Sequence, residues 1–121
     1  MFDRKQKKLF RFSSQEREVI IEALNEFYQA ELVKGQDFPE IHEMVQRVKA
    51  LTMQGDKYEL WLHNKDDFDI VRKSLDEMIL DKKAKGKPYD KTLDIFLKVN
   101  QAPTLQEIRK EKAQQSRGER T

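Results

Sequence analysis

The sequence contains no cysteine, few glycines and no long apolar run. Without cysteine there is no disulfide, no thiol nucleophile and no thiolate metal site. The four glycines are not arranged as a phosphate-binding or dinucleotide-binding loop. No apolar stretch approaches the roughly 18 residues that span a bilayer, and the basic N-terminus lacks the apolar segment of a signal peptide. We therefore expect a cytoplasmic protein that has no membrane partner.

Motifs that carry catalytic or metal chemistry are also scarce. His42 and His63 have no second donor at a metal-site spacing, and no serine lies in a G-x-S-x-G motif. Asp66, Asp67 and Asp69 lie where a helix is predicted to begin. We interpret them as acids that favour the positive end of the helix dipole rather than as a cation site. The sequence predicts no enzyme, no cofactor and no metal.

Charge is abundant but unevenly distributed. Charged residues make up 38% of the 121 residues and hydrophobic residues 37%, which predicts one domain with an economical core. Residues 1–12 carry five bases and one acid, residues 13–81 carry eight bases and sixteen acids, and residues 82–121 carry eleven bases and five acids. The basic ends are either solvated faces and tails or surfaces for an acidic partner or a phosphate backbone.

The chain nearly repeats itself at an offset of 51 residues, as from Leu9 to Leu60. We define copy one as residues 8–50 and copy two as residues 58–101. Identical or similar residues recur at strand, helix and turn positions of both copies. The identities are Leu9/Leu60, Leu24/Leu75, Glu26/Glu77, Lys34-Gly35/Lys85-Gly86 and Val48/Val99.

Each copy is predicted to form a strand, a helix, a glycine-containing turn and a second helix. In copy one, an alternating apolar segment precedes Ser13 and Glu16, which have the spacing of a capping box. Asn64 and Asp67 occupy the same places in copy two. The predicted fold is mainly α with a minor two-stranded β element. It is built from an internally duplicated strand-helix-helix unit, and a pseudo-twofold axis relates the two copies if the strands pair antiparallel. The alternative is a plain four-helix bundle in which the strands are only extended lead-ins.

The composition changes after Pro103. Residues 1–103 are predicted to form a single compact domain. Residues 104–121 begin with a capping-box spacing but are almost entirely polar. We expect them to form a frayed helix that runs into a flexible basic tail.

Trp61 is the only tryptophan, and its orientation depends on the strand register. If Leu60 and Leu62 point inward, Trp61 is exposed as an interaction anchor. The alignment of Trp61 with Phe10 instead favours an inward tryptophan.

The densest basic run lies between the last two helices of the repeat. Its counterpart in copy one, residues 31–36, is not basic, so this run is where the copies differ most. Together with the basic tail and with Arg4, Lys5, Lys7 and Lys8, the run predicts a discontinuous phosphate-binding footprint. The candidate partner-binding or nucleic-acid-binding residues are Lys82, Lys83, Lys85, Lys87, Tyr89, Arg109, Lys110 and Lys112.

Residues 14–26, which read SQEREVIIEALNE and lead to Lys34-Gly35, resemble small helical proteins of Gram-positive bacteria and their phages. The resemblance implies a short accessory protein that binds a host or phage protein, as an inhibitor or adaptor encoded by a phage or mobile element. Our hypothesis is stoichiometric binding of a protein partner. The alternatives are a nucleic-acid-associated accessory protein that uses the basic loop and termini, and a homodimer.

Overall fold

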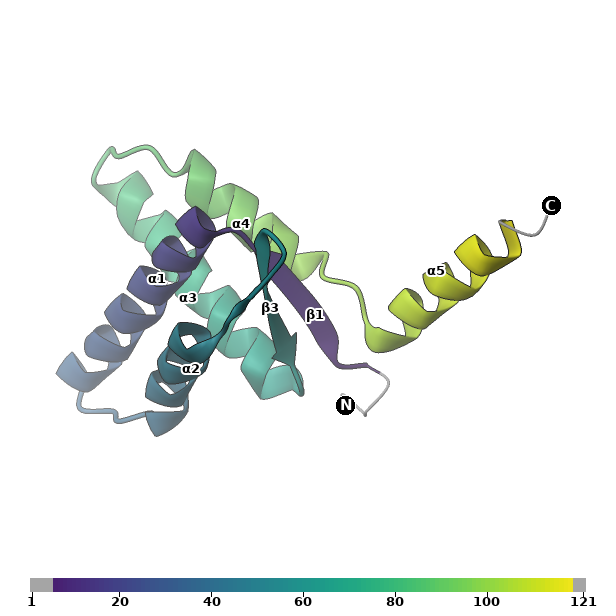
Figure 1. The fold of residues 1–121 in the computed structure, drawn as a ribbon. Helices are drawn as coiled ribbons and strands as arrows, with labels where there is room; N and C mark the ends of the chain where they lie inside the picture. Colours follow the sequence, from purple (N-terminus) through teal and green to yellow (C-terminus); the bar gives the residue numbers. More distant parts are fainter. Residues whose placement is uncertain (1–5, 119–121) are drawn as a thin grey trace.

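The computed structural model describes residues 6–118, with side chains to residue 112. Within these residues, four helices pack against one side of a small sheet and a fifth helix extends away, so the predicted mainly helical fold with a minor β element is confirmed at that level (Figure 1). The elements in chain order are β1 (Lys8–Phe12), α1 (Ser14–Val33), α2 (Pro39–Ala50), β2 (Met53–Gln54), β3 (Lys57–Leu62), α3 (Lys65–Ala84), α4 (Asp90–Asn100) and α5 (Leu105–Gly118).

Local sequence signals explain where the two longest helices begin. The Ser13 hydroxyl accepts a hydrogen bond from the Glu16 amide at 3.2 Å, and the Glu16 carboxylate accepts one from the Ser13 amide at 2.9 Å. Asn64 accepts from the Asp67 amide at 2.8 Å, while the Asp67 carboxylate accepts from the His63 amide at 3.0 Å. These contacts satisfy amides that the first helical turn leaves without a partner.

The same two helices end in the same way. Gly35 has φ +82° and Gly86 has φ +66°, a left-handed conformation that a side chain disfavours. After each glycine the next amide donates back to the helix, from Gln36 to the Glu31 carbonyl at 2.9 Å and from Lys87 to the Lys82 carbonyl at 2.8 Å. Both ends are therefore Schellman motifs, which turn the chain towards α2 and α4.

The sheet has three antiparallel strands in the order β1-β3-β2, so the predicted count of two was wrong. The extra strand is only two residues long and forms a hairpin with β3 across Gly55, which has φ +69°. The sequence did not predict this strand, because two residues are too few to show alternation. Strands β1 and β3 pair antiparallel, which is the arrangement that the sequence left open as the condition for a pseudo-twofold axis.

The register places Trp61 on the opposite face from the core. Phe10 lies opposite Leu60, and both point into the core, while Leu9 lies opposite Trp61 on the other face. The alignment of Trp61 with Phe10 was therefore misleading. Trp61 is half-buried, and the Lys7 ammonium lies 4.6 Å from its ring centre.

The core lies between the sheet and helices α1 to α4. It combines Phe10, Phe12, Leu60 and Leu62 of the strands with apolar residues of all four helices. Helix α5 instead extends away from these helices (Figure 1). Its start is held at the edge of β1, where the Leu105 amide donates to the Lys7 carbonyl at 2.9 Å. A frayed helix was expected here, and the structure has a helix to Gly118; residues 119–121 of the predicted tail lie outside the described residues.

Two ion pairs join neighbouring helices, one between α1 and α4 and the other between α2 and α3. The Lys98 ammonium of α4 lies 2.6 Å from the Glu16 carboxylate of α1. The Arg47 guanidinium of α2 lies 3.0 Å from the Asp67 carboxylate of α3 and donates to the Trp61 carbonyl at 2.7 Å. The acids that cap α1 and α3 therefore also hold neighbouring helices in place.

Candidate docking groove

The predicted basic residues do not form one surface. Lys82 and Lys83 lie in the last turn of α3, where positive charge complements the helix dipole. Lys83 lies 5.1 Å from the ring centre of Tyr89, and Lys85 pairs with Asp81 at 3.0 Å. Lys87 continues this basic turn between α3 and α4.

The basic residues of α5, Arg109, Lys110 and Lys112, are exposed at the opposite end of the molecule from that turn (Figure 1). The single footprint that combined both clusters is therefore not formed, because α4 separates them and α5 extends away. Among the N-terminal bases, Lys8 lies 4.5 Å from the ring centre of Phe68, and Lys7 covers Trp61. Arg4 and Lys5 lie outside the described residues.

A cavity of about 540 Å³ lies between α1, the start of α2 and the first half of α3. Its apolar lining includes Phe27 from the second half of α1 and Phe38 from the turn that follows the helix. Ile41 of α2 and Ile70 of α3 complete the apolar lining. Five carboxylates from the three helices border the same cavity: Glu31, Glu40, Asp66, Asp69 and Glu77.

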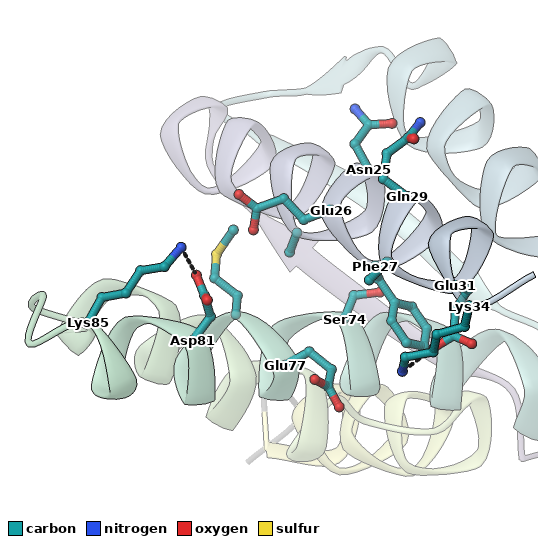
Figure 2. Close-up of a pocket in the computed structure, with 13 residues that line it drawn as sticks. Asn25, Glu26, Phe27, Gln29, Glu31, Lys34, Ser74, Glu77, Asp81 and Lys85 are labelled. Atoms are coloured by element: carbon teal, nitrogen blue, oxygen red, sulfur yellow. Dashed lines mark hydrogen bonds and ion pairs between the residues drawn. The ribbon is translucent and has the colours of Figure 1, made fainter.

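A second cavity of about 510 Å³ continues between the C-terminal halves of α1 and α3 (Figure 2). The two cavities share Phe27, Glu31 and Glu77, so we treat them as one surface, the acidic groove. In Figure 2, Glu26 projects from α1 on the side that faces α3, which carries Glu77 and Asp81. The packing of α1 against α3 thus brings acids from two helices to one cleft.

Negative charge exceeds positive charge in the groove. Seven carboxylates and three lysines line the two cavities. Glu31 pairs with Lys34 at 3.4 Å, and Asp81 pairs with Lys85 at 3.0 Å. Asp69 pairs with Arg72 at 3.6 Å. The other four, which have no salt bridge within residues 6–112, are Glu26, Glu40, Asp66 and Glu77.

The pKa of Glu26 responds to this environment. Partial desolvation raises the pKa of its carboxyl group, and the nearby charges of Glu22 and Asp81 raise it further. Lys82 and Lys85 lower it, but their effect is smaller. The cleft between α1 and α3 therefore disfavours the ionised form of the Glu26 carboxyl group.

Exposed apolar side chains lie beside the groove, at the end of α1 and the start of α2. Leu32 is 38% exposed, Val33 89% and Phe38 40%, all at the junction of α1 and α2. The corresponding segment of the sequence, residues 31–36, was predicted only to lack the basic run of copy two. The apolar pair Leu32-Val33, just before Lys34-Gly35, is a signal in the sequence that could have indicated this surface. Side chains at such a helix end are expected to be solvated and therefore polar.

Two of the three acids at the start of α3, Asp67 and Asp69, are engaged in helix and ion-pair contacts. Asp67 accepts from the His63 amide and pairs with Arg47, as described above, and Asp69 pairs with Arg72. Within the described residues there is no group of three or more His, Cys, Asp or Glu side chains that could hold a metal ion. Over the same part of the chain, no helix is long and apolar enough to cross a membrane.

Comparison with protein families, with curated proteins and with solved structures found no match to this chain.

Proposed function

We propose that this chain is a non-enzymatic interaction protein that binds a protein partner stoichiometrically in the acidic groove. The observation that supports the proposal is the combination of exposed Phe38, an apolar lining and a border of unpaired carboxylates in one cleft. Interfaces between proteins commonly join an apolar centre to a polar rim in this way. An inhibitor or adaptor encoded by a phage or mobile element would work by such binding.

The two strand-helix-helix units are, we infer, an internal duplication with a pseudo-twofold axis. Helix α1 spans residues 14–33 and α3 spans residues 65–84, which is the predicted offset. The cross-unit ion pairs support the axis, because Glu16 and Asp67 are equivalent positions and so are Lys98 and Arg47. We infer that the units differ in function at the junctions between their two helices, because the first carries exposed Leu32 and Val33 where the second carries lysines.

Nucleic-acid binding is the alternative proposal. Because the basic clusters are separated, it would use two independent phosphate-binding surfaces instead of one footprint. The exposed bases of α5 and the basic turn after α3 would each bind phosphates alone. The carboxylates of the acidic groove would have to face away from the nucleic acid. Binding of this kind should be strongest at low salt, where counterion release contributes most.

Affinity capture with matched variants tests the proposed function. We suggest the tagged full chain, F38S in the groove and L97S on α4, because Phe38 and Leu97 are 40% and 44% exposed. Serine suits position 38, which is the N-cap of α2. A protein from lysate of the encoding cells should be recovered in stoichiometric amount with wild type and L97S but not with F38S. Equal recovery with all three, or recovery of nucleic acid alone, would contradict the proposal.

A further inference from the structure

We propose that the acidic groove accepts a basic amphipathic segment of a protein, in which apolar side chains are flanked by Lys or Arg. This inference rests on the proposed function and specifies the chemistry of the partner. Two properties of the groove support it, namely its excess of unpaired negative charge and its apolar lining.

The charge argument begins with the four carboxylates that have no salt bridge. Glu40 borders the cavity from α2, Asp66 and Glu77 border it from α3, and Glu26 lies on α1. A neutral or acidic partner would desolvate these groups without providing a counter-charge, which is unfavourable. A basic partner provides the counter-charge, and it also offsets the charges of Glu22 and Asp81, which add to desolvation in raising the pKa of Glu26.

The apolar argument explains why charge alone is insufficient. Phe27 and Ile70 are half-buried and Phe38 is exposed, so the lining is open to an incoming apolar side chain. Covering these side chains removes apolar surface from water, which favours binding by roughly 25 cal/mol per Å². A small polycation cannot do this. A helix with apolar residues at i, i+3 and i+4 combines both properties on one face.

The test uses the full chain and three fluorescent peptides of equal length, in which the two residue types are spaced so that each type lies on one face of a helix. The first contains Lys and Leu, the second Glu and Leu, and the third Lys and Gln. Fluorescence anisotropy should show binding of the Lys/Leu peptide that weakens strongly at about 1 M salt, where the Debye length is about 3 Å. The Glu/Leu and Lys/Gln peptides should bind at least about tenfold more weakly, because each lacks one of the two properties.

Paired charge variants locate the binding surface. E40Q/E77Q removes two unpaired carboxylates of the groove, whereas E18Q/E43Q removes two exposed carboxylates of α1 and α2 outside it. The groove variant should weaken binding of the Lys/Leu peptide about tenfold and the control about twofold or less. Equal weakening by both variants, or equal binding of the Lys/Gln peptide, would overturn the inference.

Other results separate this inference from the proposed function. Loss of a captured protein with F38S, together with its full retention with E40Q/E77Q, would support the proposed function and would contradict the inference that the partner segment is basic. A second copy of the chain is a different occupant. Concentration-dependent dimerisation in light scattering that F38S abolishes would assign the groove to self-association and overturn the inference.

Discussion

Replacing Lys98 with methionine should destabilise the fold through the contact between α4 and the start of α1. The Lys98 ammonium lies 2.6 Å from the Glu16 carboxylate, and the two side chains are 50% and 17% exposed. Exposed ion pairs contribute about 0.2–1 kcal/mol. Because Glu16 is well shielded, we expect a loss near the upper limit, about 1 kcal/mol, or about 4 °C in the unfolding midpoint.

The loss in K98M should depend on pH. Desolvation raises the pKa of Glu16, but the hydrogen bond from Lys98 and the contacts with Ser13 outweigh it, so the pKa lies below the ordinary value of 4.5. A lowered carboxyl pKa stabilises the fold above the unfolded-state pKa, and this stability disappears as pH falls through the folded-state pKa. The difference in the free energy of unfolding between wild type and K98M should therefore be largest at pH 7 and disappear in acid.

Urea unfolding followed by circular dichroism at both pH values provides the measurement. E16Q is the control, because adding K98M to E16Q should cause little further loss. R47M is the matched variant in the other unit. It should remain destabilised in acid, because the hydrogen bond from Arg47 to the Trp61 carbonyl, 2.7 Å long, does not titrate. A loss in K98M that is equal at pH 7 and in acid would refute the reasoning.

Three further substitutions test the fold and its electrostatics by chemical denaturation. The raised pKa of Glu26 means that the wild-type fold loses stability as pH rises from 4.5 through the folded-state pKa, so E26Q should be more stable at pH 7 but not in acid. A gain that persists in acid would show that charge is not the cause. L60A should cost about 2–5 kcal/mol and W61A about 1 kcal/mol, because only Leu60 is fully buried; equal losses would contradict the register. G86A should cost about 1 kcal/mol from the positive φ alone, since its Cβ would meet nothing within 4 Å, and a neutral effect would contradict this.

The elements that the sequence predicted well are those with short-range signals. The capping residues Ser13 and Asn64 and the turn glycines Gly35 and Gly86 act within a few residues, so their roles are visible in the sequence. The strand register is different, because it depends on which residues pair across the sheet. Repeat alignment placed Trp61 with Phe10, whereas pairing placed it opposite Leu9.

Most residues of the candidate site could not be predicted from the sequence. Glu26 and Asp81 are far apart in the chain and share a cleft only because α1 packs against α3. The acidic middle of the sequence was visible, but its concentration on one groove follows from this helix packing. The basic clusters show the reverse effect, because residues that suggested one footprint lie at opposite ends (Figure 1).

Amide chemical shifts of the full chain, recorded while the Lys/Leu peptide is added, test the central claim most directly. Our account predicts that the largest changes occur at Phe27, Phe38 and Ile70, which line the acidic groove. Changes centred on Trp61 or on Lys83, or no saturable change at all, would contradict it.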